Sequence, residues 1–163
     1  MARKAQSLTM TTTELPRVVF DCNIFVQAFL SEIGPAHECF RLAREAHIAL
    51  LSSESILEEV QDVLSRPKLV KLAFSITSDR IEQYLEWVRS ICVVVTDVNS
   101  FYEVERDPKD SKYVDLAITG KCCFLVSRDK DLLDLASDGE FNSLFPSLVV
   151  CNPVAFLSMM RNQ

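Results

Sequence analysis

The sequence predicts a three-layer α/β domain in which a central parallel sheet is flanked by helices. Short apolar runs alternate with helical patterns along the chain, and strands that are apolar at every position are typical of a sheet covered on both faces. A length of 163 residues with 48% apolar composition suits one compact domain, and no repeat or linker divides it. We therefore expect a loose polar tail over residues 1–15 and a single domain over residues 16–163.

The first half of the chain is expected to form two strands and five helices. "RVVF" at 17–20 and "HIALLS" at 47–52 are the strands. Between them, "NIFVQAFLSE" and "AHECFRLAREA" have helical character and are separated by Gly34 and Pro35. "SESILEEVQDVLSR" at 53–66 is an amphipathic helix that ends before Pro67. "KLVKLAF" at 68–74 and "SDRIEQYLEWVRS" at 78–90 follow as helices, the second behind a Thr77 or Ser78 cap.

The second half of the chain repeats this alternation. "ICVVVT" at 91–96, "CCFLVS" at 122–127 and "SLVVC" at 147–151 are the third, fourth and fifth strands. A loop after the third strand leads past Pro108 into the helix "KYVDLAITGK". "RDKDLLDLAS" is a short helix, and "NPVAFLSMMRN" is a closing helix with Asn152 as its cap and Pro153 at its first position.

Composition narrows the class of protein. No apolar run reaches the roughly 18 residues that span a bilayer, and the N-terminus lacks a signal-peptide core, so we expect a cytoplasmic protein with no membrane partner. The six cysteines lack the spacing of a disulfide framework or a zinc site and are expected to be reduced core thiols. A formal charge of −6 argues against a nucleic-acid partner unless carboxylates hold a divalent cation, which reverses the local charge.

Acidic residues follow the ends of the expected strands, where open parallel sheets bind their ligands. The candidates, each after a different strand, are Asp21, Glu59, Asp110 and Asp129, with the polar residues Asn23, Ser127 and Asp131 beside them. Carboxylate oxygens suit hard cations such as Mg²⁺ or Mn²⁺. The two histidines, His37 and His47, lie outside these motifs, which disfavours a histidine-based zinc hydrolase.

Each acid also has a simpler structural explanation. Asp21 follows a strand, where aspartate commonly caps a helix, and acids such as those of "SRDKD" are frequent at helix starts. At 100° per residue, Glu59 lies at the margin of the buried stripe of its helix and can reach the sheet edge, whereas Glu58 should face water. Asp115 lies about 140° around the helix from Asp110, so the two are not expected to share a site.

Four stretches of sequence resemble the PIN domain family in their order and spacing. They are "VVFDCNIFVQAFL", "LLSSESILEEVQDVLSRPKL", "RDPKDSKYVDLAITGKCCFLVSRDKDLL" and "VCNPVAFL", and together they cover about residues 17–158. The likeness is to PIN proteins described as toxin components of bacterial toxin–antitoxin pairs. It implies a metal-dependent ribonuclease fold, a parallel sheet of order 3-2-1-4-5, and an acidic site for one or two Mg²⁺ or Mn²⁺ ions.

The resemblance assigns a role to each candidate residue. It implies a catalytic set of Asp21, Glu59, Asp110 and Asp129, in which Asp21, Asp110 and Asp129 are metal ligands. A shift of one residue would select Glu58 in place of Glu59. Asn23 matches a polar residue that often accompanies the first acid, and Ser127 stands where the family usually has threonine and keeps the hydroxyl. Asp131 is expected to be an outer ligand, and Asp107 is a weaker candidate.

The expected activity is hydrolysis of RNA phosphodiester bonds. A bound metal lowers the pKa of a water for in-line attack, and either Asp129 or Asp21 accepts the proton. The cations expected to contact the RNA backbone are Lys109, Lys112, Arg128 and Lys130, although ordinary surface charge explains them equally well. The resemblance further implies a homodimer and an antitoxin protein that inserts a side chain at the acidic site.

Two other phosphate-handling folds fit the sequence poorly, and one alternative within the PIN family remains. A haloacid dehalogenase needs a second aspartate two residues after the first, where this chain has Asn23. A response-regulator receiver needs an acidic pair after its first strand, which "VVFDCN" does not supply. The remaining alternative is a PIN fold that binds nucleic acid or protein with little catalysis.

Overall fold

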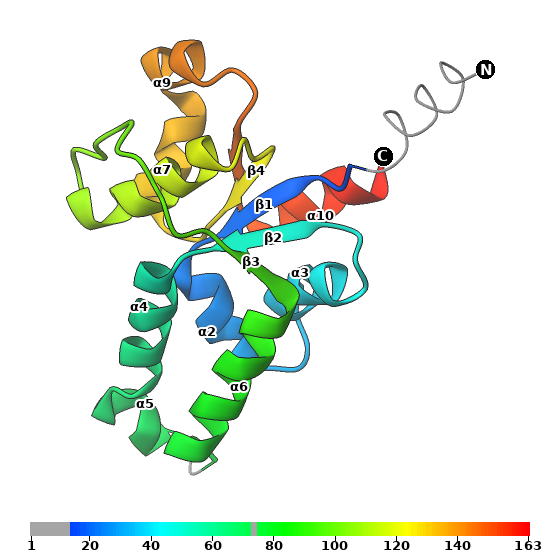
Figure 1. Cartoon of the computed structure of the whole chain (residues 1–163), viewed down its shortest axis with the longest axis vertical. Coiled ribbons are helices and arrows are strands. Elements are labelled where there is room, and N and C mark those ends of the chain that lie inside the picture. Colours follow the sequence, from blue (N-terminus) through cyan, green and yellow to red (C-terminus); the bar gives the residue numbers. More distant parts are fainter. Residues whose placement is uncertain (1–13, 73–74) are drawn as a thin grey trace.

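A parallel sheet of five strands forms the centre of the molecule (Figure 1). The computed structural model describes residues 14–72 and 75–163. The strands are Arg17–Phe20 (β1), Ala49–Ser52 (β2), Cys92–Val94 (β3), Phe124–Val126 (β4) and Val149–Cys151 (β5). Every neighbouring pair is parallel, and the order is β3-β2-β1-β4-β5. The predicted fold class and strand order are therefore confirmed.

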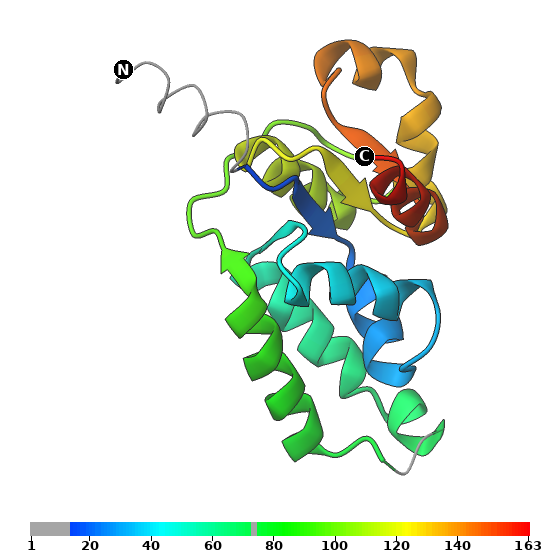
Figure 2. The same cartoon turned by 90° about the vertical axis from the view of Figure 1, so that its right-hand side faces the viewer.

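Helices connect the strands. They are Cys22–Leu30 (α2), Pro35–Arg44 (α3), Glu54–Leu64 (α4), Pro67–Leu72 (α5), Ser78–Ile91 (α6), Ser111–Thr119 (α7), Lys130–Leu133 (α8), Gly139–Leu144 (α9) and Pro153–Arg161 (α10), with 3₁₀ turns at Pro108–Asp110 (η1) and Asp134–Ser137 (η2). α2, α3 and α10 pack together, whereas α7 packs against β1, β2 and β4. Right-handed crossovers place these two groups on opposite faces of the sheet, which gives the three layers. Figure 2 shows, as Figure 1 does, that α4 and α6 extend to one end of the molecule and α9 lies at the other.

Three local features differ from the sequence-based expectation. The helix expected over 128–137 is divided into α8 and η2. The helix expected over 68–74 begins at Pro67, and residues 73–74 lie outside the described residues, as do residues 1–13 of the expected tail. α9 was not predicted, because its six residues bury only Phe141 and therefore show no apolar periodicity. Asp138 caps this helix by accepting a hydrogen bond from the Phe141 amide at 3.0 Å.

The core contains aromatic rings and thiols. Phe20 of β1 packs edge-on against Phe40 of α3 and Phe156 of α10, with ring centroids 5.1 and 6.2 Å apart. All six cysteines are free, and burial raises the pKa of Cys39 and Cys122 to about 12, so these thiols are inert. No helix among residues 14–72 and 75–163 is long and apolar enough to cross a bilayer.

Candidate metal centre

Four aspartates from two segments meet beyond the carboxyl ends of the strands. On the connection from β3 to α7, Asp107 caps the turn η1 and Asp110 is its last residue, and Asp129 and Asp131 follow β4. One carboxylate oxygen of each lies within 4.8 Å of those of the other three. The structure thus brings together Asp110 and Asp129, expected as metal ligands, with Asp131 and the weaker candidate Asp107.

The connection that carries Asp107 and Asp110 is anchored to the first turns of α7. Asp115 is buried, and its Oδ1 accepts hydrogen bonds from the amides of Phe101 and Tyr102 at 2.7 and 3.1 Å. Ser111 Oγ accepts a further bond from the Val104 amide at 2.8 Å. Asp115 therefore holds the loop in place and, as its helical position predicts, does not join Asp110.

Asp107 and Asp129 each accept a capping hydrogen bond, at η1 and α8, whereas Asp110 does not cap its helix in this way. It occupies the N-cap position of α7, yet its side chain makes no capping hydrogen bond. The side chain is buried, and among the described residues its Oδ2 has no hydrogen-bond partner. Burial, the charge of Asp129 and the contact between the two carboxyl groups raise the pKa of Asp110 to about 8. A divalent cation would satisfy this oxygen and offset the repulsion, so the residues present fit a hard cation.

Asp21 lies at the end of β1, next to the four-aspartate group, and is not a member of it. It is 4% exposed and accepts hydrogen bonds from the Asn23 amide at 3.4 Å and from the Ser127 hydroxyl. The Ser127 hydroxyl in turn accepts a bond from the Asp129 amide at 2.9 Å. Burial raises the pKa of Asp21, the bonds from Ser127 and Asn23 lower it, and the charges of Asp129 and Glu59 raise it further. Ser127 therefore fixes the position of the Asp21 carboxylate relative to the backbone of Asp129.

Glu59 is held in place by two residues of α7. The Tyr113 hydroxyl donates a hydrogen bond to Glu59, and Lys112 Nζ lies 2.7 Å from Glu59 Oε1. The same Tyr113 oxygen accepts a bond from the Cys22 amide at 3.2 Å, at the start of α2. Glu58 is exposed, whereas Glu59 is half-buried, as the helical geometry predicts. Sequence reasoning missed Tyr113; its signal is a polar-tipped ring one turn after Asp110, since a buried tyrosine hydroxyl needs a partner.

The predicted RNA-contacting cations have different surroundings. Lys112 pairs with Glu59, and Lys130 pairs with Asp134 at 3.0 Å. Lys109 and Arg128 are exposed, and neither makes an ion pair within the described chain. Arg106, which the sequence reasoning did not select, pairs with Asp134 and lies 3.8 Å from Asp131. Asn23 is exposed, and its amide nitrogen on the backbone, not its side chain, contacts Asp21.

Comparison with known proteins agrees with this geometry. Residues 17–131 match the PIN domain family. Over 125 residues the chain is 30% identical to the uncharacterized protein MJ1680 of Methanocaldococcus jannaschii. The aligned region covers 77% of this chain and 78% of the relative.

Among solved structures, the fold is similar to a chain in the crystal structure of VapBC2 from Rickettsia felis bound to a DNA fragment from their promoter. The TM-score is 0.51, with 14% identity over 83% of this chain and 98% of that chain, so this likeness concerns the fold alone. The predicted family is confirmed by the match over residues 17–131. The chain therefore belongs to the PIN domain family, whose members are generally nucleases.

Proposed function

We propose that the protein is a metal-dependent endoribonuclease whose centre is the four-aspartate group. The observation that carries this proposal is the buried Asp110 Oδ2, which has no hydrogen-bond partner among the described residues and belongs to a carboxyl group in contact with Asp129. An acid placed there for structure alone would cap its helix, as Asp129 does, or accept backbone amides, as Asp115 does. Asp110 does neither.

The proposal gives each residue a task. Asp110 and Asp129 are the principal ligands of Mg²⁺ or Mn²⁺, and Asp107 and Asp131 complete the oxygen-rich set. When bound, the ion supplies a water of lowered pKa and offsets the charge that develops on the phosphate. Asp21, the remaining predicted ligand, reaches the group through Ser127, and either Asp21 or Asp129 accepts the proton of the water.

Glu59 and the exposed cations around the acids are proposed to act on the RNA and not as metal ligands. Glu59 is fixed by Tyr113 and Lys112, so it keeps a defined position without a metal contact. Lys109 and Arg128, which are exposed, are the cations available to meet phosphate oxygens.

Cleavage of a fluorescent single-stranded RNA tests this function. We expect cleavage with Mn²⁺ or Mg²⁺ and none in EDTA, and a loss of more than about a hundredfold in Asp110→Asn. Glu58→Gln is the matched control, because it also neutralises one carboxylate but on an exposed position, and it should cleave as the wild type does. Cleavage in EDTA, or full activity of Asp110→Asn, would overturn the proposal. Folded protein that binds Mn²⁺ yet never cleaves would favour the non-catalytic alternative.

We further propose that the enzyme is the toxin of a toxin–antitoxin pair. This is supported by the sequence resemblance to toxin-type PIN proteins and by the fold shared with a chain of VapBC2. An open reading frame beside the gene should then encode a small DNA-binding protein. Co-expression should yield a complex in which RNA cleavage is suppressed, and light scattering of the free protein would show whether it forms the homodimer that the resemblance implies. A co-expressed neighbour that neither binds nor inhibits the enzyme would overturn this part.

A further inference from the structure

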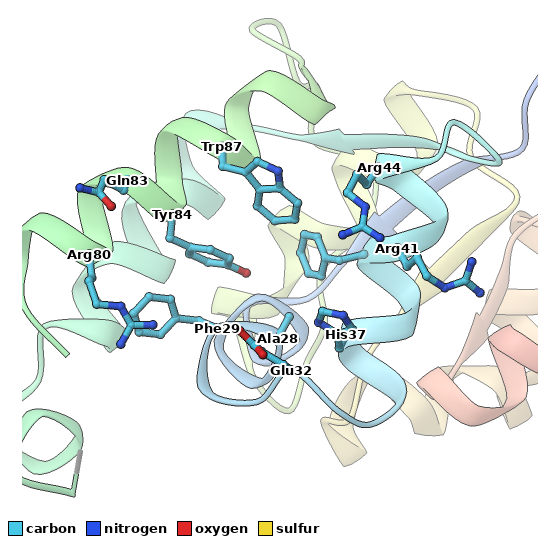
Figure 3. Close-up of a pocket in the computed structure, with 11 residues that line it drawn as sticks. Ala28, Phe29, Glu32, His37, Arg41, Arg44, Arg80, Gln83, Tyr84 and Trp87 are labelled. Atoms are coloured by element: carbon cyan, nitrogen blue, oxygen red, sulfur yellow. The ribbon is translucent and has the colours of Figure 1, made fainter. Parts of the chain in front are cut away.

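A cavity lies at the other end of α2 from the acidic residues. It has a volume of about 370 Å³, is open to solvent and is lined mainly by α2, α3 and α6 (Figure 3). Asp21 caps the first turn of α2, whereas Ala28 and Phe29, which line the cavity, lie in its last turn. Phe29 is eight positions after Asp21, a rise of about 12 Å along the helix. The cavity is therefore a separate feature from the proposed metal centre.

Aromatic rings form one wall of this cavity. Tyr84 and Trp87 project from α6, with ring centroids 5.9 Å apart and planes only 30° from parallel. Phe29 of α2 lies 5.0 Å from the Tyr84 ring, and Phe40 of α3 lies 6.0 Å from the Trp87 ring. The Tyr84 hydroxyl donates a hydrogen bond to the Phe25 carbonyl at 2.7 Å, which fixes the ring. Trp87 remains 36% exposed, so a flat ligand has a rigid aromatic surface to stack on.

Two arginines flank the aromatic wall. Figure 3 shows Arg44 on α3 directed toward the cavity and Arg80 on α6 beside Phe29. The Arg80 guanidinium lies 5.1 Å from the centre of the Phe29 ring and donates one bond to the Ser75 carbonyl. Within the described chain Arg80 makes no ion pair, and Arg44 has only Glu45 at 3.6 Å. Both guanidinium groups therefore keep donors for an anion.

The other ionisable residues leave the cavity positive. Arg41 also lines the cavity but is already paired with Glu38 and Glu45. With Arg41 set aside, the lining holds two guanidinium groups, those of Arg44 and Arg80, against one acid, Glu32. A local excess of positive charge is unusual in a chain of net charge −6. It is complementary to a ligand that is both flat and anionic.

A nucleotide is both flat and anionic. Proteins that bind single-stranded nucleic acid combine aromatic rings that stack bases with cations that meet phosphates. We propose that the cavity binds an unstacked nucleotide of single-stranded RNA, with its base on Tyr84 and Trp87 and its phosphates at Arg44 and Arg80. The choice of RNA as the nucleic acid rests on the proposed nuclease function.

Trp87 provides a direct test, because it is the only tryptophan of the chain. Its fluorescence is titrated with a short adenine oligoribonucleotide in EDTA, so that neither cleavage nor bound metal is needed. We expect saturable quenching whose affinity falls with added salt. Arg44→Gln and Arg80→Gln should each weaken binding by about tenfold, and each should make the salt dependence shallower by about one phosphate contact. Lys121→Gln, which removes one exposed positive charge that does not line the cavity, should bind as the wild type does.

A second measurement covers the stacking surface. Trp87→Ala should weaken binding of a dye-labelled RNA, followed by anisotropy, by about tenfold. Because Trp87 is partly exposed, this variant should keep the circular dichroism spectrum of the wild type. Unchanged RNA affinity in a folded Trp87→Ala protein would overturn the proposal.

Three other outcomes would also overturn it: no quenching by RNA, equal quenching by poly-glutamate of the same charge, or tighter binding of free adenosine monophosphate than of the oligonucleotide. The first excludes the site, the second reduces it to charge attraction, and the third assigns it to free nucleotides. The proposed nuclease is judged separately. Quenching without cleavage keeps this inference and overturns the nuclease, whereas cleavage without quenching does the reverse.

Discussion

The two ends of α2 offer opposite chemistry. At its N-cap, Asp21 lies beside four further aspartates, one of which has a buried oxygen without a hydrogen-bond partner among the described residues. At its last turn, aromatic rings and arginines line a cavity. The first site is negatively charged, as the whole chain is, and the second is positively charged. Net charge alone would predict only cationic partners. The placement of charges along one helix is consistent with binding of both a metal ion and an anion.

The largest expected effect is a loss of Mn²⁺ binding in variants at the acidic end of α2. Asp110→Asn and Asp129→Asn should each weaken Mn²⁺ binding, measured by calorimetry, by more than about a hundredfold, because each removes a principal ligand. RNA quenching of Trp87 should stay within about twofold of the wild type. A parallel loss of both signals would show that the two ends form one site and would break the comparison.

A smaller loss is expected from the glutamate on α4. Glu59→Gln should reduce cleavage by between about tenfold and a hundredfold, because the side chain held by Tyr113 and Lys112 loses its charge beside the acids. Glu58→Gln, one residue away and exposed, should be neutral. The reverse ranking in a cleavage assay would assign the second family acid to Glu58.

The acidic end should make stability depend on pH when metal is absent. The pKa of Asp110 is raised to about 8 from 3.8, so its favourable contribution is complete below about pH 4 and is lost as the pH rises toward 8. The free energy of unfolding in EDTA should therefore fall across this range, and the fall should be shallower in Asp110→Asn. Urea unfolding at several pH values measures this free energy. Equal slopes for the wild type and Asp110→Asn would show that Asp110 is not the group responsible.

Removing one hydroxyl should have a modest effect. Tyr113→Phe keeps the buried ring and deletes both the bond to Glu59 and the acceptor for the Cys22 amide. We expect kcat to fall about fivefold with KM unchanged, because substrate contacts are intact while Glu59 is less well positioned. A change confined to KM would indicate instead that Tyr113 acts through RNA binding.

The smallest expected effect is at the cavity end. Trp87→Ala should leave Mn²⁺ affinity within about twofold of the wild type, since about 12 Å of helix separates the cavity from Asp21. A clear loss of Mn²⁺ binding in a folded variant would show coupling along α2.

The fold and the acids could be predicted because their signals are local. Apolar strands mark the sheet, and the acids after the first four strands fall at the edge where parallel strands end. The choice of Glu59 over Glu58 also needs only the rotation of one helix. Tyr113 was missed because its partner Glu59 is 54 residues away, and no local pattern reports such a contact. The cavity was missed for the same reason, since α2, α3 and α6 contribute its rings and arginines from separate parts of the chain.

The Tyr113 hydroxyl has a consequence for how the molecule opens. One oxygen atom of α7 contacts Glu59 of α4 and the backbone amide that begins α2. Movement of α7 away from α2 and α4 breaks both bonds at once, so the three helices should open together as one cooperative unit. The Cys22 amide then reports on that unit, because its exchange with deuterated solvent measures the free energy needed to undock the three helices.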